Sequence, residues 1–144
     1  MTVSHILKAK GRDVITAAAT AKVSDIARTL SEKRIGAVVI TGAGGKIEGI
    51  VSERDVVRHI GRDGAKALDL EVSAIMTRNV RTARENDSES ELMALMTEHR
   101  IRHLPVVHEG KLSGMVSIGD VVKNRIEAIE REAEDMKAYI ATAG

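Results

Sequence analysis

The chain contains the same sequence pattern twice. Residues 51–57 (VSERDVV) return as residues 116–122 (VSIGDVV), and each segment follows a glycine placed two residues earlier, Gly49 and Gly114. Shorter matches occur at a spacing of 66 residues, namely residues 14–17 with 80–83 and residues 34–35 with 100–101. Internal repeats constrain architecture more strongly than any single motif. The 144 residues therefore form two copies of one small unit, and functional sites are expected as a related pair.

Each copy has the pattern of strand, helix, two strands and helix. In the first copy, Val23, Ile26, Ala27 and Leu30 have the i, i+3, i+4, i+7 spacing of an amphipathic helix. In the second copy this stripe is Leu92, Leu95, Met96 and His99. Ser24 and Ser88 are the predicted N-caps of these helices. Two β-rich segments around a glycine turn follow in each copy and predict a hairpin, and Pro105 predicts an edge position or an irregular strand start.

Composition limits the classes of function. With one tyrosine and no phenylalanine or tryptophan, the chain offers almost no aromatic surface for stacking bases. The net charge of +1 provides no overall basic field for nucleic acid. Zero cysteines exclude disulfides and thiol catalysis. The chain has no apolar segment of the roughly 20 residues that a membrane helix needs and no apolar core of a signal peptide, so we expect a cytoplasmic protein without a membrane partner.

The last predicted helix continues past the point where its counterpart ends. Its apolar residues are spaced alternately by four and three, as in a coiled coil; they are Val122, Ile126, Ile129, Ala133, Met136 and Ile140. One interpretation is a helix that folds back onto its own domain. The interpretation we favour is self-association of two chains through this stripe, as part of a larger interface.

The repeated motif Gly-x-x-Ser-x-x-Asp lies where a strand ends and a helix begins. Taken alone, each copy is explained by helix capping, because Ser at the N-cap and Asp three residues later form a near capping box. The same turn presents free backbone N–H groups to an anion. The serine hydroxyl can bind that anion, and the aspartate can accept hydrogen bonds from both hydroxyls of a ribose. Glycine in the preceding strand would let a ligand approach the backbone. Recognition of a sugar phosphate is therefore chemically reasonable.

The two copies, with residues 102–107 (RHLPVV) and 114–120 (GMVSIGD), resemble the cystathionine-β-synthase (CBS) domain, and the resemblance covers nearly the whole chain. It implies an α/β fold of two β-α-β-β-α repeats packed with pseudo-twofold symmetry, plus a C-terminal helical extension. The expected boundaries are residues 1–66 and 67–126 for the repeats and 127–144 for the extension. It also implies two clefts for adenosine-containing ligands, a homodimer, and regulation of a separate, unidentified protein.

The resemblance assigns residues to each cleft. In the first cleft, Asp120 would bind the ribose, with Ser117 beside the ribose-phosphate and Arg102 at the phosphate. Its remaining expected members are Thr16 at the base or sugar and the apolar walls Ile50, Val51 and Met115. His103 would either assist the phosphate or lie on the strand surface.

The second cleft would use Asp55 for the ribose, together with Ser52, Thr82 and the phosphate contact Arg54. Gly119 stands opposite Arg54, and Gly36 stands opposite Arg102, so we expect the clefts to differ in affinity or ligand. About one arginine per cleft favours AMP or NAD(H), with ATP as a further candidate. No metal is predicted.

Three other classes of function are alternatives. Stand-alone catalysis lacks a nucleophile elbow or a phosphate-binding glycine fingerprint. Nucleic-acid binding would use the arginines near the link between copies, namely Arg58, Arg62, Arg78, Arg81 and Arg84, but the acidic residues among them indicate a solvated mixed surface. A dimerisation scaffold without a ligand is the third alternative, against which the presence of Ser and Asp in both copies argues.

Overall fold

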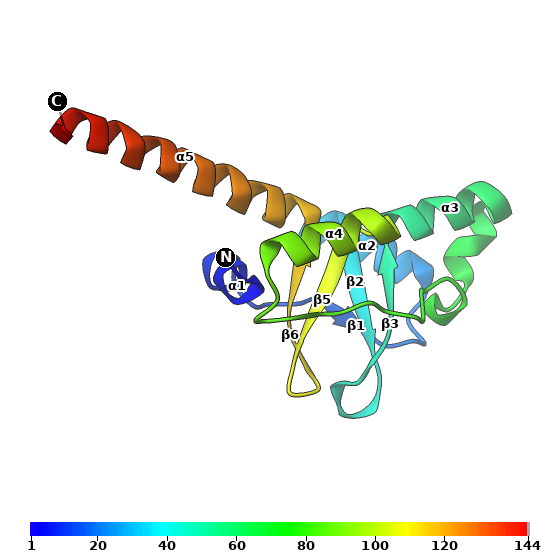
Figure 1. The fold of residues 1–144 in the computed structure, drawn as a ribbon. Coiled ribbons are helices and arrows are strands. Elements are labelled where there is room, and N and C mark those ends of the chain that lie inside the picture. The colour runs from blue at the N-terminus through cyan, green and yellow to red at the C-terminus, as the bar shows by residue number, and fades with distance from the viewer. Residues whose placement is uncertain (144) are drawn as a thin grey trace.

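Each repeat folds into a three-stranded sheet with flanking helices in the computed structural model, which describes residues 1–143 (Figure 1). Helix α1 (Val3–Lys10) precedes the first repeat, which consists of β1 (Thr16–Ala17), α2 (Val23–Lys33), β2 (Ala37–Thr41), β3 (Ile47–Ser52) and α3 (Glu53–Asp63). Short 3-10 turns at Gly64–Asp69 and Val72–Ala74 lead to the second repeat. That repeat consists of β4 (Ala83–Arg84), α4 (Glu89–His99), β5 (His103–His108), β6 (Lys111–Ser117) and α5 (Ile118–Ala143). The predicted order of elements is confirmed.

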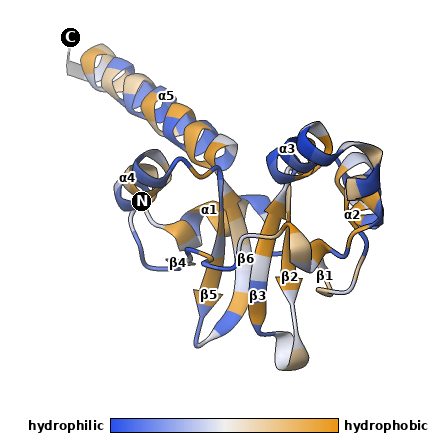
Figure 2. Cartoon of the chain, turned by 90° about the vertical axis from the view of Figure 1, so that its right-hand side faces the viewer, coloured by the Kyte–Doolittle hydropathy of each residue, from blue (hydrophilic) through white to orange (hydrophobic). Residues whose placement is uncertain are grey.

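The two sheets have the same topology. Strand β2 lies between β1, to which it is parallel, and β3, to which it is antiparallel. Strand β5 has the same relation to β4 and β6. The sheets lie side by side in the middle of the molecule, and the apolar residues are concentrated on their strands (Figure 2). This arrangement is the predicted α/β fold of two paired repeats, and it places the ends of β3 and β6 near the junction between them.

Each repeat has its own apolar core. Val23, Ile26 and Leu30 of α2 pack in the first, and Leu92 and Met96 of α4 in the second, as the helical spacing predicts. The first core also contains Val51, which is fully buried. Val51 therefore belongs to the core, and the expectation that it forms a cleft wall is wrong.

Two repeat-related glycines have a packing role that the sequence interpretation missed. A Cβ atom built on Gly114 would lie 2.8 Å from a methyl carbon of Leu7, and one built on Gly49 would lie 2.6 Å from the sulfur of Met76. Leu7 and Met76 come from the segments that precede each repeat. The space above each glycine is thus filled by the protein itself, so the expectation that a ligand approaches the strand there is wrong.

Local signals at element ends were predicted with mixed success. Ser88 accepts a hydrogen bond from the Glu91 amide in a complete capping box, which confirms it as the N-cap of α4. Ser24 lies inside α2, whose N-cap is Lys22, because the Val23 amide bonds to the Leu70 carbonyl and fixes the helix start. Pro105 lies in the central strand β5, one residue before the segment paired with β4, rather than at a sheet edge.

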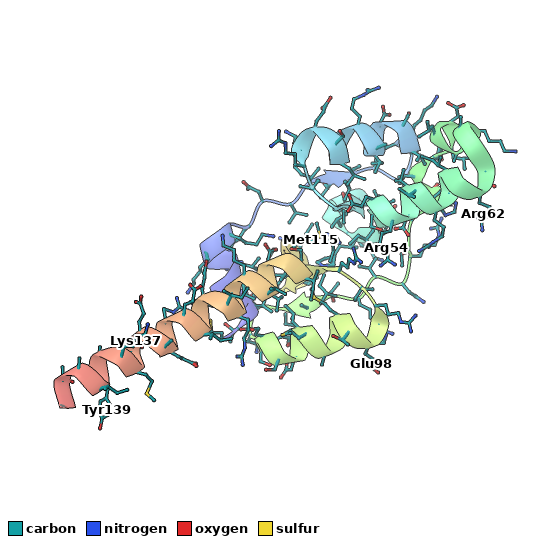
Figure 3. All side chains as sticks on the ribbon, turned by 90° about the horizontal axis from the view of Figure 1, so that it is seen from above. Arg54, Arg62, Glu98, Met115, Lys137 and Tyr139 are labelled. Carbon is teal, nitrogen blue, oxygen red and sulfur yellow. The ribbon has the colours of Figure 1, made fainter. Side chains whose placement is uncertain are left out.

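Helix α5 extends well beyond the body of the molecule (Figure 1). Its apolar stripe stays exposed, with Ile129 at 52% and Ile140 at 65% relative exposure. Figure 3 shows Lys137 and Tyr139 far out on this helix. The alternative in which the helix folds back onto its own domain is therefore wrong. Among residues 1–143, no helix combines the length and apolar character that crossing a membrane requires.

Candidate functional site in the cleft between the repeats

The two Ser-x-x-Asp segments adopt the same local geometry. The Ser52 amide donates to Asp55 Oδ2 at 2.8 Å, and the Asp55 amide donates to Ser52 Oγ at 3.3 Å. The corresponding distances for Ser117 and Asp120 are 2.9 Å and 3.1 Å. Both segments form the reciprocal capping that the spacing predicts. Helix capping therefore explains the shared motif, and any difference between the clefts must come from their surroundings.

A cavity of about 570 Å³ opens beside Asp55. This volume lies within the range of roughly 300–1,000 Å³ that small-molecule sites have. Both repeats contribute to it, since residues from β3 and the start of α3 face residues that follow α4. Six of the predicted site residues line it, namely Ile50, Ser52, Arg54, Asp55, Arg102 and His103. Arg54 lies close to the junction of the repeats in the view from above (Figure 3).

The cavity is strongly basic. Its lining includes Arg54, Arg58, Arg81, Arg100 and Arg102, against the two carboxylates of Glu53 and Asp55. The sequence interpretation placed Arg102 and Ile50 in the other cleft and counted about one arginine per cleft. The count of one arginine is wrong for this cavity, because the segment 99–103 brings Arg100 and Arg102 of the second repeat to the Asp55 side. Arg102 also lines a smaller hollow with Ile118 at the start of α5, so its role beside Asp120 stays a prediction. Arg58 and Arg81, weighed above as nucleic-acid contacts, line the cavity instead.

Other cavity residues carried weaker sequence signals. Gly36, Ala37, Thr77, Asn79, Val80, His99 and Ile101 complete the lining. Arg100 did have a signal, because it repeats Arg34, and both residues adopt a left-handed conformation at the end of a helix, with φ of 53° and 54°. The repeat singles out the position of Arg100, but it does not predict that this residue faces the Asp55 cavity.

The remaining predicted residues lie elsewhere. Thr82 lines a separate hollow with Glu85 and His108, so it does not join Asp55. Thr16 is exposed on β1, and neither Thr16 nor Gly119 lines the Asp55 cavity. Met115, Ser117 and Asp120 form a second group at the end of β6. Residues 1–143 contain no group of three or more His, Cys, Asp or Glu side chains placed to hold a metal ion.

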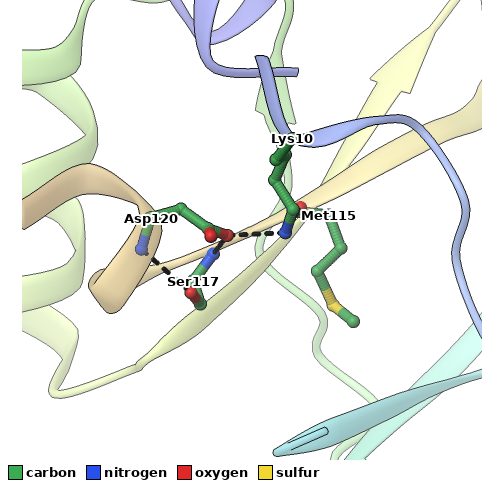
Figure 4. Close-up of polar contacts among 4 residues, drawn as sticks. All are labelled: Lys10, Met115, Ser117 and Asp120. Atoms are coloured by element: carbon green, nitrogen blue, oxygen red, sulfur yellow. Dashed lines mark hydrogen bonds and ion pairs between the residues drawn. The ribbon is translucent and has the colours of Figure 1, made fainter. Parts of the chain in front are cut away.

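The carboxylate of Asp120 has a partner that the motif does not predict. Lys10 Nζ lies 2.6 Å from Asp120 Oδ2 and donates a second hydrogen bond, of 2.8 Å, to the Met115 carbonyl (Figure 4). Burial raises the pKa of Asp120, but the hydrogen bonds from Lys10 and Ser117 outweigh burial and leave the pKa below its usual value. Asp120 is therefore held as an anion, and its charge is neutralised within the chain.

His103 lies at the junction of the two repeats. A Cβ atom on Gly36 would lie 2.7 Å from His103 Nε2, so the imidazole from β5 packs directly on the first repeat. Burial lowers the pKa of His103, and this effect exceeds the opposing influence of Glu53 and Asp120. His103 is thus a neutral, half-buried link between the Asp55 and Asp120 sides rather than a residue of the open strand surface.

The lowered pKa of His103 predicts a pH dependence of stability. Below a pH near 6.5 the unfolded chain binds a proton at this histidine more readily than the folded chain does. The free energy of unfolding should therefore fall as the pH is lowered through 6.5 and stay higher above it. Urea unfolding of the wild type and of His103→Gln at pH 5.5 and 7.5 measures this difference. An equal pH dependence in both proteins would contradict the prediction.

Comparison with known proteins identifies the family of the two repeats. The CBS domain family matches residues 3–62 and again residues 72–127. The chain belongs to the CBS domain family. Among curated proteins, the mitochondrial CBS domain-containing protein CBSX3 of Arabidopsis thaliana is 32% identical over 147 aligned positions, covering 96% of this chain and 71% of that protein. The predicted family is therefore confirmed.

Solved structures of CBS proteins share the fold. A CBS-domain containing protein from Agrobacterium tumefaciens is 44% identical with a TM-score of 0.85, covering 87% of this chain and 99% of that one. A CBS domain protein from Pyrobaculum aerophilum, solved as a complex with AMP, is 28% identical with a TM-score of 0.74. The alignment covers 83% of this chain and 89% of that protein. The paired CBS architecture predicted from the repeat is confirmed.

Proposed function

We propose that this CBS pair is a regulatory module that binds an adenine nucleotide in the Asp55 cavity and transmits its bound state to a separate partner protein. The cavity itself is the observation that supports this proposal most strongly. It combines a carboxylate for ribose hydroxyls, a helix start with a serine hydroxyl, and five arginines. The AMP complex of the Pyrobaculum aerophilum protein supports the same class of ligand.

The charge of the cavity bears on the number of phosphates. Five arginines against two carboxylates leave an excess of three positive charges when the histidines are neutral. Arginine forms strong bidentate hydrogen bonds with phosphate oxygens. This favours ADP or ATP over AMP and NAD(H), which the expected single arginine had favoured, and it disfavours S-adenosylmethionine, which has no phosphate. A cytoplasmic location remains a prediction from the sequence.

Parallel calorimetric titrations with AMP, ADP, ATP, NADH and S-adenosylmethionine test this proposal. We expect ATP or ADP to bind at least ~10-fold more tightly than AMP, which corresponds to about 1.4 kcal/mol. Arg102→Ala should reduce this preference while leaving AMP binding, because it removes one of the five arginines that line the cavity. Absence of heat with every compound, together with an unchanged melting temperature at high ligand concentration, would favour the scaffold alternative.

We further propose that two chains associate through the apolar stripe of α5. The exposure of this stripe supports the predicted homodimer. The large apolar residues of the stripe are exposed on one side of the helix; they are Val122, Ile126, Ile129, Met136 and Ile140. Contiguous exposed apolar surfaces of this kind mark association sites. Ile129→Glu should shift the protein from dimer to monomer in light scattering. Arg131→Glu places the same charge on the opposite side of the helix and should leave the dimer intact. A monomeric wild type would contradict this proposal.

A further inference from the structure

The two capped aspartates differ in what faces them. Asp55 lies beside the open cavity, and its other carboxylate oxygen is 3.5 Å from Arg58 Nη1, a side chain that is 64% exposed. Asp120, its repeat-related counterpart, is 2.6 Å from Lys10 Nζ and does not line that cavity. Both aspartates thus have a cationic partner, but Asp55 lines a cavity and is paired with an exposed arginine at 3.5 Å, whereas Asp120 is held by Lys10 at 2.6 Å.

Lys10 reaches Asp120 because α1 is anchored on β6. Leu7, one turn earlier in α1, is fully buried and packs over Gly114. In the other repeat, Met76 packs over Gly49 in the same way, and the backbone amide of the next residue, Thr77, donates to the Ile50 carbonyl at 2.9 Å. Met115 repeats Ile50, and its carbonyl accepts instead from Lys10 Nζ. Lys10 thus supplies a cation at a position where the first repeat uses a backbone amide.

The contact has the geometry of an internal ligand. Lys10 Nζ bridges two acceptors that belong to β6 and the start of α5, and its side chain is only 35% exposed. Asp120 Oδ2 already accepts from the Ser117 amide, so Lys10 completes its hydrogen bonding. A ribose hydroxyl directed at Asp120 Oδ2 would have to displace this charge-assisted bond, which is stronger than a neutral one.

We propose that Lys10 is a built-in occupant of the second cleft, so that each chain binds a single nucleotide, at Asp55, until Lys10 is withdrawn from Asp120. This inference rests on the proposed function in taking the aspartates as ribose acceptors. The rival role for Lys10 is that of a phosphate contact for a nucleotide in the second cleft. The two roles predict opposite effects of removing the lysine.

Calorimetric stoichiometry with ATP as the probe separates these roles. We expect one ATP per chain for the wild type, two for Lys10→Ala, and one again for Lys10→Ala combined with Asp120→Ala. Lys8→Ala removes a lysine from the same helical turn that makes no such contact and should keep one ATP per chain. Two ATP per wild-type chain, or no gain in Lys10→Ala, would overturn the inference. No binding to any variant would instead count against the proposed function.

A second measurement tests the contact without any nucleotide. Acetylation of surface amines with a limiting reagent, followed by mass spectrometry, compares the rates of Lys10 and Lys8. We expect Lys10 to react several-fold more slowly than Lys8 in the wild type, and to approach the rate of Lys8 in Asp120→Asn. Equal rates in the wild type would overturn the inference whatever the nucleotide titrations show.

Discussion

Asp55→Ala should weaken nucleotide binding by about 100-fold or more. The substitution removes the carboxylate that faces the cavity and would accept hydrogen bonds from the two ribose hydroxyls. Hydrogen bonds to a charged group contribute about 1.5–3 kcal/mol each, so the loss of two corresponds to at least two orders of magnitude in affinity. Calorimetric titration with the tightest nucleotide of the panel measures this effect.

Asp120→Ala is the matched control for this substitution. It removes the same capping contacts, because Asp120 accepts from the Ser117 amide as Asp55 accepts from the Ser52 amide. Loss of a cap costs about 1 kcal/mol of stability in either repeat. Only Asp55→Ala should reduce affinity strongly, while Asp120→Ala should leave it within about threefold of the wild type. Wild-type affinity in Asp55→Ala would show that the ribose assignment is wrong.

Leu7→Ala should destabilise the fold by about 2–5 kcal/mol. Leu7 is fully buried in the core of the second repeat, where it covers Gly114. Truncating it removes apolar burial and leaves a cavity beside a residue that has no side chain to fill it. The free energy of unfolding from urea titration measures the loss.

Lys8→Ala provides the control, since Lys8 is exposed on the same helix and its replacement should change stability by less than about 0.5 kcal/mol. A loss below about 1 kcal/mol in Leu7→Ala would show that α1 is not an integral part of the second repeat. Such a result would also weaken the inference about Lys10, because Leu7 holds the end of α1 beside Asp120.

Local patterns predicted most of the secondary structure. The stripes of α2 and α4 and the capping of Ser88 depend on residues within about four positions of one another, and the structure confirms them. Ser24 was wrong because a distant carbonyl, that of Leu70, sets the start of α2. The repeated Ser and Asp also have the predicted geometry, since a capping box is a local feature.

Assignment of residues to clefts was less successful for a specific reason. Arg102 and Ile50 were placed with Asp120 from the resemblance to the CBS family, whereas both line the cavity beside Asp55. Successive side chains of β3 point to opposite faces of the sheet, and the side chain of Val51 points into the core instead of the cleft. A family pattern gives equivalent positions in each repeat, but it does not say which segments of the two repeats face each other in this chain.

The amino-acid sequence alone determined the duplicated unit, the family, the order of elements and the pair of capped aspartates. Each of these depends on local patterns of residues that are close together in the chain. Only the tertiary structure decided that five arginines gather at Asp55 and that Lys10 neutralises Asp120. Lys10 and Asp120 are 110 positions apart, and their contact depends on how α1 packs against β6. No local periodicity encodes such packing, so the difference between two nearly identical motifs becomes visible only in the folded chain.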